Sequence, residues 1–279
     1  MNMKNIIKIL SFLLLINSFN VFSQNVASDD AQMFKDYFSK RFPNIEIEEY
    51  VDGSYIFDED AKEQWLEIED FPPYEFDIER GQELFETPFT NGKSYASCFE
   101  NNGIGIKQKY PKWNEAQKAV ITLEYAINQC RESNNEIPLA YGKGDIAQIS
   151  AYMAFTSRGN IIDIQVSTKE SIEAYLQGKK YYFSKRGQLN MACANCHVAT
   201  SNLRLRNEIP GPMLGQVTHW PVYRSKWENT GTIQRRFKGC NTQVRAKALE
   251  YQSETYRNLE YFLTYISNGL PINGPSTRK

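Results

Sequence analysis

The stretch Cys193-Ala194-Asn195-Cys196-His197 decides the fold class of this chain. Cys-x-x-Cys-His is the attachment signature for haem c: each thiol adds to one vinyl group of the porphyrin, and the histidine then faces the iron. A redox dithiol or half of a zinc site would also use such cysteines, but the sequence has no second Cys or His pair at zinc spacing. We therefore predict one haem c per chain, attached to Cys193 and Cys196 and ligated by His197.

The first 23 residues have the layout of a secretory signal peptide. Lys4 and Lys8 accompany an apolar stretch that ends at Phe22, and a polar, acid-rich segment follows. Polar residues interrupt the apolar stretch, which falls short of ~20 clean residues, so cleavage is favoured over membrane anchoring. We expect a periplasmic protein whose mature chain has no membrane span.

The charges are balanced in total but unevenly placed. The chain has 32 basic and 33 acidic residues, which argues against a nucleic-acid binder. Residues 29–89 hold 19 acids and 5 bases, whereas residues 200–247 hold 9 bases and 2 acids. The second segment is therefore the part of the chain that attracts anions.

An internal repeat follows an acidic N-terminal extension at residues 24–77, which we interpret as a wrap or arm. Gly81-Gln-Glu-Leu-Phe85 precedes Tyr95-Ala-Ser-Cys98-Phe99, and Gly178-Lys-Lys-Tyr-Tyr182 precedes the haem motif in the same way. The two halves therefore have the same frame, but only the second has the haem-binding residues.

Each half then reaches a later cysteine, Cys130 or Cys240, and ends in an amphipathic helix with a closing glycine. A helix, a haem-binding pentapeptide, a loop and a closing helix follow one another in this order in small c-type cytochromes. We predict a mainly α protein with two cytochrome c-like domains in tandem, at residues 78–160 and 161–279, the first without haem.

Two local signals predict helix positions. A first short helix is expected around Ala31 to Phe42 in the extension. The first helix of the second domain is expected to begin with a capping box formed by Ser167 and Glu170.

The first half cannot attach a haem, because Tyr95 stands in place of the first cysteine and Phe99 in place of the histidine. Cys98 and Cys130 occupy the places of Cys196 and Cys240. Without a haem between them, these two thiols can approach each other and oxidise in an exported protein. We predict a disulfide that contributes ~2 to 4 kcal/mol to the stability of the first domain.

Three residues are candidates for the sixth ligand of iron. Met213 or His219 would give a simple electron carrier. Cys240 is left unpaired by the cysteine count, and Arg235, Arg236 and Lys238 surround it with positive charge that favours a thiolate. Because Cys240 is the cysteine without a disulfide partner, we favour it as the sixth ligand of the iron.

The second half resembles SoxA, the haem subunit of the SoxAX cytochrome of periplasmic thiosulfate oxidation, in its single-haem form. The stretches that carry the resemblance are 187–197, 221–224 and 236–246, together with 95–99 and 126–131 in the first half. The resemblance covers about Gly81 to Gly269, and only the acidic arm and the last ten residues lie outside it.

The resemblance implies that Cys240 is the distal haem ligand and the active-site thiol, often carried as a persulfide, and that Arg236 helps to hold the anionic substrate. The implied enzyme is an L-cysteine S-thiosulfotransferase, which couples thiosulfate oxidatively to the carrier cysteine of SoxYZ. Its implied partner is a SoxX-type cytochrome c, in a heterodimer.

Two alternatives stay open at this point. A plain c-type electron carrier would use Met213 or His219 and leave Cys240 idle. A thiosulfate dehydrogenase would join two thiosulfates into tetrathionate and would need no carrier protein.

Overall fold

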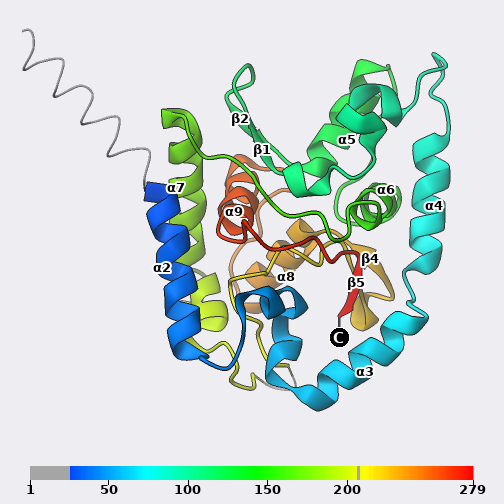
Figure 1. Ribbon diagram of the computed structural model, residues 1–279. Coiled ribbons are helices and arrows are strands. Elements are labelled where there is room, and N and C mark those ends of the chain that lie inside the picture. Colours follow the sequence, from blue (N-terminus) through cyan, green and yellow to red (C-terminus); the bar gives the residue numbers. More distant parts are fainter. Residues whose placement is uncertain (1–25, 206–207, 279) are drawn as a thin grey trace, which may run out of the picture.

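The computed structural model describes residues 26–205 and 208–278, and the predicted signal peptide at residues 1–23 lies outside them. The expectation of a mainly helical chain is confirmed (Figure 1). The α-helices are α2 (Val26–Arg41), α3 (Glu59–Asp70), α4 (Glu75–Glu86), α5 (Leu123–Ser133), α6 (Asp145–Phe155), α7 (Lys169–Phe183), α8 (Ile233–Gln243) and α9 (Glu254–Tyr265). Shorter helical turns are η1 (Ile47–Phe57), η2 (Tyr95–Cys98), η3 (Glu100–Gly103), η4 (Lys107–Lys109), η5 (Asn195–Ala199) and η6 (Ser225–Trp227). The strands are β1 (Lys112–Asn114), β2 (Ala119–Ile121), β3 (Val222–Arg224), β4 (Asn229–Gly231) and β5 (Ser276–Arg278).

Two helix pairs form the framework, and a glycine sits at each crossing. Helix α4 packs on α6, and α7 packs on α9. A Cβ atom on Gly81 would lie 2.1 Å from the carbonyl oxygen of Gln148, and one on Gly178 would lie 2.0 Å from that of Asn258. Only glycine allows the backbones to approach this closely.

The same order of elements occurs twice. We call α4 to α6 (residues 75–155) the first repeat and α7 to α9 (residues 169–265) the second repeat. In each repeat an antiparallel hairpin, β1–β2 or β3–β4, leads directly into a helix, α5 or α8. From the hairpin onward, equivalent residues are 110 positions apart, as Cys130 and Cys240 are.

Each repeat has its own apolar core. The core of the second repeat includes Tyr175 and Phe262, whose rings pack edge to face across α7 and α9. The core of the first repeat contains Phe85, Tyr95 and Phe99. Because both cores are centred on a helix crossing, the repeats place their pentapeptides in comparable positions.

Two predicted helix starts are wrong. Helix α2 begins at Val26, five residues before the predicted start at Ala31. The capping box of α7 is formed by Thr168 and Ser171, whose hydroxyls and backbone N–H groups bond reciprocally, and not by Ser167 and Glu170. Thr168 has the extended backbone that a cap requires, so the helix begins one residue later than predicted.

The extension wraps the second repeat and meets the C-terminal segment. Helix α2 lies beside α7 (Figure 1), where Lys179 forms an ion pair with Asp30 at 2.6 Å. Strand β5 joins β3 in parallel register, with Val222 opposite Ser276, and contacts α3. The extension therefore contacts α7 through α2 and the C-terminal segment through α3.

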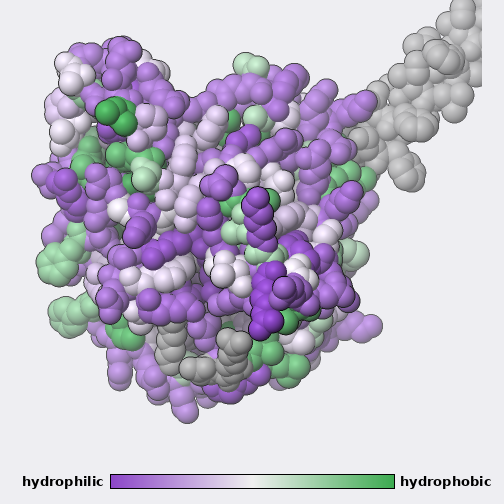
Figure 2. Space-filling model, turned by 180° about the vertical axis from the view of Figure 1, so that it is seen from behind, coloured by the Kyte–Doolittle hydropathy of each residue, from purple (hydrophilic) through white to green (hydrophobic). Residues whose placement is uncertain are grey.

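The surface is predominantly hydrophilic on the face shown in Figure 2, with apolar side chains in small separate groups. No helix in the described part of the chain is long and apolar enough to cross a bilayer.

Candidate functional site

The haem motif lies on a π-helical turn, η5. The side-chain oxygen of Asn195 accepts a hydrogen bond from the N–H of Ala192 at 2.8 Å. The carbonyl of Asn195 accepts one from the N–H of Thr200, five residues later, at 3.0 Å. Turns of this width are rare and frequently mark functional sites. Asn195, a variable position of the motif, therefore shapes its backbone.

His197 is oriented by a backbone carbonyl. Its Nδ1 lies 2.8 Å from the carbonyl oxygen of Gly211. Part of the ring surface faces a cavity. Desolvation nevertheless lowers the pKa of His197 to about 4. The hydrogen bond to Gly211 opposes this lowering, and the positive charge of Arg236 adds to it. The imidazole is therefore neutral at pH 7. With Nδ1–H donating to Gly211, the Nε2 lone pair is free to bind a metal.

The two motif cysteines are free thiols close to a third. Burial raises the pKa of Cys193, and the charge of Cys240 adds to the shift, whereas a 3.6 Å contact from Arg186 opposes it. Burial and the charge of Cys240 likewise raise the pKa of Cys196. The fold thus brings Cys240 near both haem-attachment positions.

Helix α8 carries Cys240 and Arg236. The helix is anchored in the core by Ile233 and Phe237. Residues four apart lie on one helix face, so Arg236 and Cys240 are neighbours on α8. Within the described ranges, Arg236 makes no hydrogen bond or ion pair, and Cys240 is half-buried with a free thiol.

A cavity of about 180 Å³ opens beside His197. Its wall is formed by residues 208–212, the side chain of His219, and part of the N-terminal extension from Gly53 to Ala61. Among the residues that the structure describes, six charged ones line it: Arg204, Arg224, Arg236, Arg278, Asp58 and Glu208. Four cations against two anions give the cavity a positive balance.

The chain matches the family described as "SoxA/TsdA, cytochrome c domain" over residues 80–162 and 177–272. It is 50% identical to the L-cysteine S-thiosulfotransferase subunit SoxA of Chlorobaculum tepidum, over 92% of this chain and 89% of the relative. It is 51% identical to the same subunit of Allochromatium vinosum, over 90% of each chain. The chain belongs to the SoxA family.

A solved structure shares the SoxA fold. The crystal structure of SoxXA from P. pantotrophus aligns with a TM-score of 0.71 at 26% identity, covering 78% of this chain and 84% of the other. A SoxA chain has a cytochrome c domain and binds haem c. The free thiols of Cys193 and Cys196 and the neutral imidazole of His197 fit that group.

The other residues predicted from the sequence have three different positions in the structure. Cys98 and Cys130 are joined by a disulfide. Met213 is fully buried in the core of the second repeat and is not among the described lining residues of the cavity. His219 lines the same cavity as His197, and burial lowers its pKa well below the ordinary value.

One side of the site was not predicted from the sequence. The acidic extension, interpreted above as a wrap or arm, contributes Gly53, Tyr55 and Asp58 to the lining of the cavity, and Arg278 near the other end of the chain lines it too. The local signal in this stretch was the glycine itself, at position 53. Gly53 adopts φ +67°, a left-handed backbone conformation that favours glycine.

Proposed function

We propose that this chain is the haem subunit of a periplasmic L-cysteine S-thiosulfotransferase, which couples thiosulfate to the carrier cysteine of a SoxYZ-type protein. The observation that carries the proposal is the position of Cys240. It is a free thiol four residues from Arg236 on one helix face, close to the cysteines of the haem motif. The names of relatives that match nine tenths of the chain support the same activity.

Cys193 and Cys196 would hold the haem covalently, and His197 and Cys240 would ligate its iron. When bound, haem c accepts electrons one at a time. We propose a single haem per chain, because buried aromatic rings at Tyr95 and Phe99 occupy the corresponding positions of the first repeat. In this interpretation, a signal peptide (1–23) and an extension (24–77) precede a haem-less domain (78–160) and a haem c domain (161–279).

The reaction is an oxidation: the carrier thiol R–SH and S₂O₃²⁻ give R–S–S–SO₃⁻, one proton and two electrons. Thiosulfate carries two negative charges, so its binding in a partly desolvated site requires fixed positive partners. Arg236, which makes no ion pair in the described part of the chain, would hold the anion. Cys240 would provide the sulfur nucleophile, as a thiolate or persulfide.

The proposal includes a partner cytochrome. Two electrons leave each coupling step, and one haem in this chain takes up one at a time. A SoxX-type cytochrome c in a heterodimer would accept the second, consistent with the SoxXA assembly of the similar solved structure.

The test is Cys240→Met in the full complex. Haem attachment depends on other residues, and methionine can ligate iron, so the variant should be folded and haem-loaded. It has no thiolate, so thiosulfate coupling to SoxYZ should fall by more than about 100-fold. Thr242→Met, on an exposed position of the same helix, is the matched control and should couple normally.

Coupling by Cys240→Met at the parent rate would show that Cys240 is a bystander. Tetrathionate formation by the parent complex from thiosulfate alone, without SoxYZ, would favour a thiosulfate dehydrogenase instead.

A further inference from the structure

The cavity contains two arginines whose charge is not compensated. Arg204 pairs with Asp58 at 3.4 Å, and Arg224 pairs with Glu208 at 3.2 Å. Arg236 and Arg278 also line the cavity, and neither has a carboxylate within 4.0 Å among the residues that the structure describes. Arg236 has a role in the proposed function. Arg278 has none, although it is only 7% exposed.

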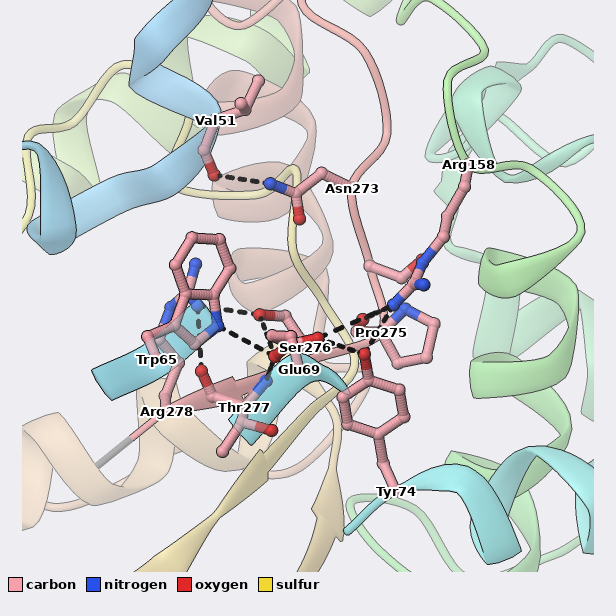
Figure 3. Close-up of polar contacts among 11 residues, drawn as sticks. Val51, Trp65, Glu69, Tyr74, Arg158, Asn273, Pro275, Ser276, Thr277 and Arg278 are labelled. Atoms are coloured by element: carbon pink, nitrogen blue, oxygen red, sulfur yellow. Dashed lines mark hydrogen bonds and ion pairs between the residues drawn. The ribbon is translucent and has the colours of Figure 1, made fainter. Parts of the chain in front are cut away.

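The C-terminal segment that carries Arg278 is fastened to the N-terminal extension (Figure 3). The carboxylate of Glu69 accepts hydrogen bonds from the Thr277 N–H at 2.6 Å and from the Ser276 hydroxyl at 3.2 Å. The side chain of Asn273 donates to the carbonyl of Val51 at 3.2 Å. Strand β5 therefore has a fixed position against the cavity.

The side chain of Arg278 is also fixed, by aromatic rings and by hydrogen bonds. Its guanidinium lies 4.8 Å from the ring centre of Tyr55 and 5.1 Å from that of Trp65. Nη1 donates to the Ser276 hydroxyl at 2.7 Å and to the Thr277 carbonyl at 2.9 Å. Among the described residues, Nη2 contacts one acceptor, the Asp52 carbonyl, at 3.4 Å. All of these hydrogen-bond partners are neutral, so within the described part of the chain the buried cation has no directly paired anion.

Two further groups converge with Nη2. A Cβ atom on Gly53 would lie 3.6 Å from Arg278 Nη2 and 3.9 Å from His219 Nδ1. His219 Nδ1 is fully buried and has no hydrogen-bond partner, in a residue that is 8% exposed. Gly53, with no side chain, leaves the space between them free. Two buried nitrogen atoms, one of them cationic, thus face one small space.

We propose that Arg278, His219 and the turn at Gly53 form a carboxylate cradle for a propionate group of haem c. Haem carries its two propionates on the edge opposite the vinyl groups. The vinyl edge is fixed at Cys193 and Cys196, which are not among the described lining residues of the cavity. The propionate edge would lie away from these cysteines, on the side of the wall built by the extension and β5. This inference rests on haem attachment and not on the thiosulfate reaction.

Arg278→Gln in the haem-loaded protein tests the cradle. Loss of the positive charge disfavours the reduced haem, so the midpoint potential should fall. A propionate without its cation titrates at higher pH, so the potential should become dependent on pH between about 5 and 8. The propionate bending band in the resonance Raman spectrum should shift. Arg204→Gln, an exposed arginine of the same cavity, should change none of these.

His219→Phe is the second variant, because it keeps the buried volume and leaves the packing of Arg278 in place. It should shift the same Raman band. The proposal is overturned if both variants keep the band and the potential of the parent. It is also overturned if Arg278→Gln raises only the KM for thiosulfate, since Arg278 would then bind substrate.

Discussion

In the first repeat, Tyr95 and Phe99 fill the positions that Cys193 and His197 hold in the second repeat. Tyr95 is 1% exposed; its ring stacks on Phe85 and meets the edge of Phe89. In the second repeat the same region has free thiols and a charged cavity. One scaffold thus supports either an aromatic core or a binding cavity.

The two repeats differ most in the connection after the pentapeptide. It runs from Phe99 to Tyr110 in the first repeat and from His197 to Trp220 in the second, 11 against 23 positions. The longer connection provides the Gly211 carbonyl that orients the ring of His197. The helix crossings at Gly81 and Gly178 are alike. The comparison shows that the helix pairs determine the common scaffold. The connection from His197 to Trp220 and helix α8 determine the site.

The largest expected effect concerns the disulfide of the first repeat, which has no counterpart among the free cysteines of the second. The bond between Cys98 and Cys130 closes a loop with a sequence separation of 32. Replacing both cysteines by alanine should lower the free energy of unfolding by about 3 kcal/mol. Haem content should not change, because the proposed attachment residues Cys193 and Cys196 lie in the second repeat. Guanidinium unfolding and a pyridine haemochrome assay measure the two quantities, and a loss of haem would break the comparison.

An effect of about the same size is expected from a buried carboxylate, which the two repeats carry at different positions of the same helix contact. The first repeat has Glu124 bonded to Ser150, and the second has Gln234 bonded to Glu260 at the matching positions. Burial raises the pKa of Glu260 to about 7; the charge of Glu124 adds to the shift and Lys107 opposes it.

Glu260 therefore binds its proton more tightly in the folded chain than in the unfolded one. Its contribution to stability is present at acidic pH and is lost as the pH rises from about 4.5 to about 7. Glu260→Gln should remove this loss, on the order of 3 kcal/mol. Urea unfolding at several pH values measures it. Glu254→Gln, exposed on the same helix, should leave the profile unchanged, and an unchanged profile in Glu260→Gln would refute the assignment.

The smallest expected effect is a difference in stability between removing the N-cap threonine of α5 and removing that of α8. The hydroxyl of Thr122 accepts a hydrogen bond from the N–H of Tyr125 at 3.1 Å, whereas Thr232 makes no such side-chain bond. Thr122→Ala should therefore cost about 1 kcal/mol more than Thr232→Ala. Equal losses in urea unfolding would mean that the two helix starts are equivalent after all.

Local chemistry was readable from the sequence, and long-range contact was not. The positive charge around Cys240 was readable from neighbouring residues, and Gly81 and Gly178 marked equivalent positions of the internal repeat, although not the helix crossing that they allow. The start of α7 was misplaced because adjacent hydroxyl residues, Ser167 and Thr168, are chemically equivalent as caps. No local pattern indicates that Gly53 and Arg278 share a cavity, since such contacts depend on the whole fold.

The wall built by the extension and β5 also has a consequence for the order in which the chain folds. The hydrogen bond between Asn273 and Val51 joins residues 222 positions apart, and that between Thr277 and Glu69 joins residues 208 apart. Closing loops of this length costs more chain entropy than joining Gly81 to Gln148 or Gly178 to Asn258, which are 67 and 80 positions apart at the two helix crossings. We therefore expect the helix pairs to form before this wall. We expect the pocket to be open on that side until the extension and the C-terminal segment meet, which would leave an incoming porphyrin a path to the motif cysteines.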